Sequence, residues 1–135
     1  MSHMTRIQGE IKSLAGLETA CHILGLTFHR GATKARYYDG TGIKTFNCDH
    51  VIEVPGYADQ ISVTKKSTGY VLSFDQWLGR DKNKIKQICG DDLEILKQTY
   101  QMAMIRKYAD EKRLHMETAK VMRDGKKKIR IKLFG

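Results

Sequence analysis

The longest periodic pattern in the chain predicts an amphipathic helix from about Asp92 to Arg113. Its apolar side chains recur at three- and four-residue steps, and they are Leu93, Leu96, Tyr100, Met104 and Tyr108. Asp91 is the predicted N-cap, with Glu94 at the spacing of a capping box. An apolar face as broad as this one should lie on a sheet, so the rest of the chain is expected to supply strands.

The stretches before this helix alternate between apolar and polar residues, which predicts strands. The first is Thr5–Lys12, and a short helix follows it from Ser13 to Gly25. Further strands are predicted at Leu26–His29, Thr33–Tyr38, Ile43–Phe46, His50–Val54, Gln60–Thr64 and Tyr70–Phe74. Lys65–Gly69 is the predicted hairpin loop between the last two, and the polar, basic stretch Gly79–Gly90 is predicted to be a loop.

The end of the chain is predicted to form a basic hairpin. His115–Met122 and Lys127–Phe134 are its strands, and Arg123–Lys126 is its turn. In the second strand Lys128, Arg130 and Lys132 alternate with apolar residues, which spaces the cations by about 7 Å on one face. The order β-α-β(multiple)-α-β-β predicts one α+β domain over residues 1–135, with two helices packed on a mainly antiparallel sheet.

The net charge of +9 comes entirely from the second half of the chain. Residues 1–60 hold six Lys or Arg and six Asp or Glu, whereas residues 61–135 hold eighteen and nine. Such a bias favours an acidic partner such as nucleic acid, although a solvated lysine-rich surface explains it equally well. The candidate nucleic-acid contacts are Lys82, Lys84, Lys86, Lys126, Lys128, Arg130 and Lys132.

Several classes of site and location are disfavoured. No apolar run is long enough for a membrane helix, and the first residues lack the apolar region of a secretory signal. The three cysteines are far apart, which favours a reducing cytoplasm. Cys48 and His50 form the one close pair of metal-ligand types, which is too few for a metal site, so we expect no metal. We also expect no cofactor. Because no apolar run could cross a membrane, we expect no membrane partner. The sequence leaves the oligomeric state open.

The most specific motif lies within Gly69–Gly79, and its members are Tyr70, Leu72, Asp75, Trp77 and Gly79. Together with Met1-Ser2-His3 and Asp49-x-Val51-Ile52, it resembles the family called hypothetical chloroplast frame 35. That family is a domain of unknown function found in bacteria, cyanobacteria, plastids and phages. Leu78 separates Trp77 from Gly79, which are adjacent in the family pattern. Relatives are often encoded near ATPases of the AAA class, so the resemblance implies an adaptor role as one alternative.

Three functions stay open at this point. The first is a small basic, non-enzymatic accessory protein that contacts nucleic acid or a nucleoprotein complex through its C-terminal half. The second is a protein–protein adaptor or regulator, for example of an AAA-type ATPase. The third is an enzyme that acts on a phosphate-bearing substrate, with Asp75 and a histidine brought together by the fold. No catalytic residue is assigned, and the non-enzymatic functions are preferred.

Overall fold

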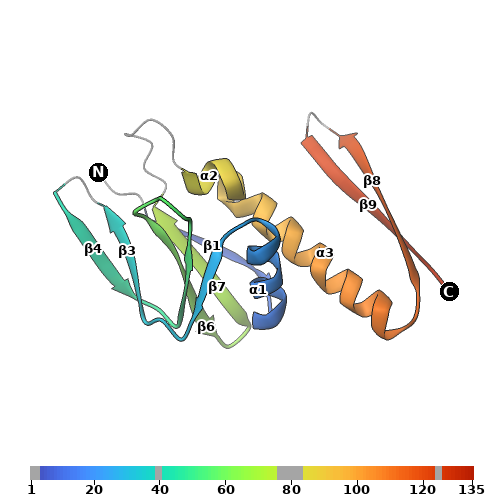
Figure 1. The fold of residues 1–135 in the computed structure, drawn as a ribbon, viewed down its shortest axis with the longest axis horizontal. Coiled ribbons are helices and arrows are strands. Elements are labelled where there is room, and N and C mark those ends of the chain that lie inside the picture. Colours follow the sequence, from blue (N-terminus) through green and yellow to red (C-terminus); the bar gives the residue numbers. More distant parts are fainter. Residues whose placement is uncertain (1–3, 39–40, 76–83, 124–125) are drawn as a thin grey trace. The chain divides into compact units, whose positions relative to one another are not determined.

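The computed structural model describes residues 4–38, 41–75, 84–123 and 126–135. The fold class is α+β with mainly antiparallel sheets, so this prediction is confirmed. The contacts within the chain divide it into two units, Met1–Tyr100 and Gln101–Gly135, which are described separately (Figure 1).

The first unit is built on a five-stranded antiparallel sheet. Its strand order is β1 (Met4–Ile11), β7 (Gly69–Asp75), β6 (Gln60–Lys66), β5 (His50–Glu53) and β2 (Thr27–Arg30). Alternation along the strands gives this sheet one apolar and one more polar face. The apolar face forms the core through side chains that are at most 1% exposed, namely Ile52, Ile61, Val63, Leu72 and Phe74.

The first helix, α1 (Leu14–Ile23), has the start and end that the sequence predicts. The side chain of Ser13 is the N-cap, because its hydroxyl oxygen accepts a hydrogen bond from the Gly16 amide at 3.0 Å. Gly25 follows the helix with φ at +75°, the left-handed conformation that favours glycine. Leu17 and Cys21 are fully buried.

A second helix, α2 (Lys84–Cys89), replaces part of the predicted loop at 79–90. That prediction was wrong for these residues, because Ile85 and Cys89 are four residues apart and both are fully buried. The lysines close to Ile85 in the sequence, which are Lys82, Lys84 and Lys86, obscured the helical spacing of these two apolar residues. Residues 79–83 of the predicted loop lie outside the described part of the chain.

The predicted capping box before the long helix is also wrong. Gly90 is the N-cap of a 3-10 turn, η1 (Asp91–Leu93), and no described side chain makes a capping hydrogen bond there. Asp92 and Leu93 have φ values of +54° and +58°, so the chain reorients there and Leu93 becomes fully buried. The long helix α3 therefore begins later than expected and spans Glu94–Glu111.

Tyr100 of α3 joins this helix to the other end of the first unit. Its hydroxyl oxygen accepts hydrogen bonds from the backbone amides of Lys12 and Ser13, each at 3.0 Å. The same residue is only 4% exposed. One side chain therefore satisfies two backbone donors where the chain passes from β1 to α1.

We expect the Tyr100→Phe variant to lose about 2 kcal/mol of unfolding free energy, because two partly buried amides lose their acceptor. Urea denaturation followed by circular dichroism measures this loss. Tyr108→Phe is the matched control, since Tyr108 is 50% exposed and should change stability little. Equal stability of the two variants would contradict this role of Tyr100.

A separate two-stranded sheet, β3 (Lys34–Tyr38) with β4 (Ile43–Asn47), is attached to the main sheet by side chains. The amide of Arg36 donates to Gln60 Oε1 at 2.9 Å, and the amide of Tyr38 donates to Asp59 Oδ1 at 2.8 Å. A small cluster beneath it contains Ala35, Cys48 and Val51, with Ala32 and Phe46 packed against them. Because Val51 is adjacent to Ile52, this cluster lies on the face opposite to the main core.

The turn between β6 and β7 is tighter than predicted. Lys66 pairs with Gly69, so the loop consists of Ser67 and Thr68 instead of five residues. Gly69 has φ at +139°, and an added Cβ would lie 2.6 Å from the carbonyl oxygen of Ile11. A side chain at this position would force the neighbouring backbone to move, which explains the glycine.

The second unit contains the end of α3 and a hairpin of two nine-residue strands, β8 (His115–Arg123) and β9 (Lys126–Phe134). This hairpin matches the sequence prediction to within one residue at each strand end that borders the turn. Among the residues of this unit whose burial is described, only Ala109 is buried. Most of the described side chains of the hairpin are exposed, and Met116 and Ile131 are half-buried.

Candidate nucleic-acid interface

The register of the C-terminal hairpin gathers positively charged positions on one face. Residues directly opposite each other in an antiparallel pair share a face. The pairs on this face are Glu117 with Lys132, Ala119 with Arg130, Val121 with Lys128 and Arg123 with Lys126. Five of these eight positions carry a cation and one carries a carboxylate. We call this set the basic face.

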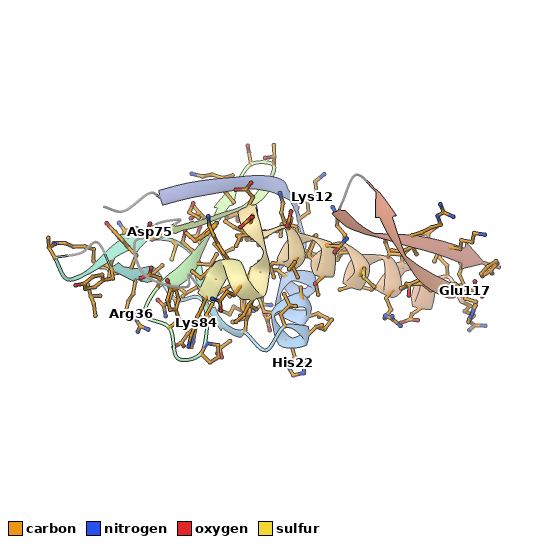
Figure 2. The ribbon with its side chains drawn as sticks, turned by 90° about the horizontal axis from the view of Figure 1, so that it is seen from above. Lys12, His22, Arg36, Asp75, Lys84 and Glu117 are labelled. Atoms are coloured by element: carbon orange, nitrogen blue, oxygen red, sulfur yellow. The ribbon has the colours of Figure 1, made fainter. Side chains whose placement is uncertain are left out.

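Both cations of the basic face whose side chains are described, Arg130 and Lys132, are exposed. Glu117 is exposed as well (Figure 2). The ion pairs found among the described side chains all lie in the first unit and involve neither Arg130 nor Lys132. The side chains of Arg123, Lys126 and Lys128 lie outside the described ones, so their places rest on the backbone register.

The second unit also carries most of the net charge. Residues 101–135 contain eleven Lys or Arg and four Asp or Glu, which leaves +7 of the total of +9. A concentration of one sign within 35 residues produces a positive potential that attracts polyanions. The charge bias seen in the sequence is therefore a property of this unit more than of the whole second half.

An aromatic pair at the open end of the hairpin was missed by sequence reasoning. The rings of His115 and Phe134 have centroids 6.0 Å apart and planes inclined by 31°. Both residues are exposed, and they continue the alternate positions of the basic face. Counting outward from the predicted Asp124-Gly125 turn would have paired these two residues.

The other predicted contacts, Lys82, Lys84 and Lys86, belong to the first unit. Lys82 lies outside the described residues. Lys84 begins α2 and is exposed, with its Nζ 3.6 Å from the place that a Cβ on Gly56 would take. Lys86 is only half exposed to solvent and makes an interaction within the protein. Lys84 and Lys86, which lie on a helix, therefore do not form the regular row that β9 forms.

The described residues of the family motif contribute to the fold. Leu72 and Asp75 are each 1% exposed, and the ring of Tyr70 lies 6.0 Å from that of His50. Asp75 is inside the first unit at the end of β7 (Figure 2). Trp77 and Gly79 lie outside the described residues. A carboxylate as buried as Asp75 is not open to a substrate from solvent.

Cys48 and His50, the one close pair of metal-ligand types, have separate structural partners. The Cys48 thiol donates to the Ala32 carbonyl oxygen at 3.6 Å. His50 Nδ1 accepts a hydrogen bond from the Gly31 amide at 2.9 Å, and its ring stacks on Phe28. Within the described ranges, no group of three or more His, Cys, Asp or Glu side chains is placed to hold a metal ion.

The three cysteine thiols are buried, and burial raises the pKa of each. Burial raises the pKa of Cys89 to about 12. Burial, followed by the charges of Cys89 and Glu18, raises the pKa of Cys21 to about 12. Burial also raises the pKa of Cys48. Cys89 therefore lacks the thiolate that nucleophilic catalysis requires.

A second polar cluster that the sequence did not indicate holds β3 to the sheet. His29 Nε2 and Glu53 Oε1 are 2.7 Å apart, and the Arg36 guanidinium lies 3.8 Å from Glu53 Oε2. The backbone amide of Arg36 donates to Gln60, so both the backbone and the guanidinium of this residue contact the main sheet. Half-exposed ion pairs of this kind add modest stability and favour a structural role for the cluster.

Comparison with protein-family models, with curated proteins and with solved structures found no match. The resemblance to hypothetical chloroplast frame 35 thus stays a prediction. None of the helices in the described ranges has the length and apolar character needed to cross a membrane.

Proposed function

We propose that this chain is a small nucleic-acid-binding protein that contacts the phosphate backbone through the basic face of its C-terminal hairpin. The observation that carries this proposal is the register of β8 and β9, which gives that face five cationic positions and one carboxylate. The charge of +7 in the same unit supports it. No catalytic role is part of the proposal.

The geometry of the row suits a polyanion with a regular repeat. Alternate residues of β9 are spaced by about 7 Å, which equals about two base-pair steps of 3.4 Å along duplex DNA. A two-stranded ribbon also fits the major groove of B-DNA. The cations can therefore lie beside every second phosphate of one strand without a change in the hairpin.

The expected binding is electrostatic and weakly selective for sequence. Phosphate contacts position a protein but carry no direct sequence information. The His115–Phe134 pair offers a surface on which an unpaired base can stack. Single strands are therefore expected to bind at least as well as duplexes.

The decisive variant reverses the charge of the two described cations, Arg130→Glu with Lys132→Glu. We expect its affinity for mixed-sequence DNA or RNA to fall at least about tenfold at low salt, because two phosphate contacts become repulsive. The slope of log affinity against log salt concentration should become shallower by about 2. Fluorescence anisotropy of a labelled oligonucleotide measures both quantities.

The matched control is Lys120→Glu with Lys127→Glu, which changes the net charge equally. These residues occupy the alternate register positions and so lie on the opposite face. We expect this control to weaken binding by less than about threefold, through the general field alone. Equal losses in both variants, or binding that ignores salt, would refute a contact through the basic face.

A pull-down with nuclease treatment distinguishes the adaptor function from the proposed nucleic-acid binding. A partner that is lost after nuclease treatment is held through nucleic acid, as proposed. A protein partner that is retained, together with unchanged binding in the charge-reversal variant, would favour the adaptor role instead.

A further inference from the structure

The second unit is incomplete as a folded body. Only Ala109 is buried among its residues with described burial, while Tyr108, Leu133 and Phe134 are 50%, 38% and 42% exposed. A two-stranded hairpin alone is marginally stable, and three or more strands with an apolar face, or packing on a helix, are needed. Met116 and Ile131 of the hairpin are half-buried, so the described apolar side chains of the hairpin are not fully covered within the unit. Additional strands would complete it.

Neither long edge of the hairpin pairs with another of the described strands. Among the described strands, β8 and β9 pair only with each other. Each strand is nine residues long, so each outer edge presents a row of backbone N–H and C=O groups. An open edge of this length is a template for pairing with another chain.

The charges distinguish the two edges. Pairing β9 with β9 of a second copy would bring two cation rows to within about 5 Å of each other, which is unfavourable. β8 instead carries Glu117 toward one end and Arg123 at the other, at positions on the same face. With residue 120 of each copy on the two-fold axis, antiparallel pairing of two β8 strands places each Glu117 opposite Arg123 of the second copy. These two pairs of opposite charge outweigh the single pair of like charge, which Lys120 forms with its own copy on the other face.

We propose that β8 pairs antiparallel with β8 of a second copy of this chain about a two-fold axis. The product is a four-stranded sheet in the order β9-β8-β8-β9. Its other face combines the apolar positions of both copies, which include Met116, Ile131 and Leu133. The four-stranded sheet supplies the additional strands that a two-stranded hairpin needs for independent stability.

This arrangement also extends the basic face. The two β9 strands lie three strand spacings apart, so their cation rows are about 14 Å apart on the same side of the sheet. That separation is close to the width of about 12 Å of the major groove of B-DNA. Self-association does not depend on the proposed function, but it doubles the surface on which that function rests.

The first test is the mass of the full chain by sedimentation equilibrium. We expect twice the mass of one chain, and association that strengthens as salt rises, because each unit of +7 repels its copy. Nucleic-acid binding should show the opposite salt dependence. A monomer at every protein and salt concentration overturns the proposal.

The second test locates the contact by single cysteines. Thr118→Cys, Ala119→Cys and Lys120→Cys are oxidised separately with diamide, with Arg130→Cys and Ile131→Cys in β9 as matched controls. Cα atoms of opposite residues in an antiparallel pair are about 4.5–5.5 Å apart, within reach of a disulfide. We expect linked dimers from at least one β8 variant and none from β9. Equal linkage from both strands overturns the β8 contact.

The two proposals can fail separately. The charge-reversed Arg130→Glu and Lys132→Glu chain should keep the dimer mass while it loses nucleic-acid affinity. A dimer that binds no nucleic acid in its unaltered form refutes only the proposed function. A monomer that binds nucleic acid through the basic face refutes only the pairing of β8.

Discussion

Phe74→Ala is expected to lower the free energy of unfolding by about 4 kcal/mol, the largest stability effect of any single change considered for this chain. Phe74 is fully buried on the apolar face of the main sheet, where Leu72 is its neighbour two residues earlier. Removing the ring takes apolar area out of the core and leaves a cavity that β7 cannot close, because β1 and β6 hold it on both sides. Urea denaturation followed by far-UV circular dichroism measures the loss.

The same chemical change at two other phenylalanines grades the effect by burial. Phe46 is half-buried in the small cluster under β3 and β4, so Phe46→Ala should cost about 1–2 kcal/mol. Phe134 is 42% exposed, and Phe134→Ala should cost less than about 1 kcal/mol. If the three variants lost similar stability, the main sheet would not contain the principal core.

The second large effect concerns thiol reactivity. A rise in pKa from 9.0 to about 12 lowers the thiolate fraction of Cys21 and Cys89 about a thousandfold near neutral pH. Both side chains are also fully buried, which blocks the reagent. We therefore expect reaction with an aromatic disulfide reagent to be at least about a thousandfold slower in the folded protein than in guanidinium chloride.

The exposed thiol of Ile43→Cys is the control, because Ile43 is 63% exposed and a cysteine there should react in the folded protein as fast as in the unfolded chain. Fast reaction of Cys21 or Cys89 under native conditions would show that α1 or α2 opens readily.

The raised pKa values of Cys21 and Cys89 also determine how the stability of the fold depends on pH. A group that holds its proton more tightly when folded stabilises the fold fully below its unfolded pKa. This contribution is then lost as the pH rises from about 9 to 12.

The sequence predicted most of the fold because most elements carry a clear period. Each of the nine strands found among the described residues corresponds to an expected stretch, and α1 has its predicted cap at Ser13. The failures share one cause, which is that tertiary contacts outweighed local signals. Asp91 and Glu94 have the spacing of a capping box, but left-handed backbone at Asp92 and Leu93 moves the helix start. α2 was missed because two buried residues among lysines give little periodic signal.

The candidate site was predictable to the extent that it depends on strand geometry. The alternation of β9 and the turn at Asp124-Gly125 predict the cation row and its opposite residues. The partial burial of Lys86 was not predictable, since its helix was not expected. The attachment of β3 through Asp59 and Gln60 also lacks a sequence signal, because hydrogen bonds from side chains to a distant backbone have no fixed spacing.

That attachment has a consequence for local opening. β3 is joined to the main sheet through acceptors on two adjacent side chains and through the ion pair of Arg36 with Glu53, not through a ladder of backbone pairs. Separating the β3–β4 hairpin therefore breaks no strand pair of the five-stranded sheet. In amide hydrogen exchange this hairpin should behave as its own cooperative unit, with protection at Arg36 and Tyr38 lost together before that of β6 and β7.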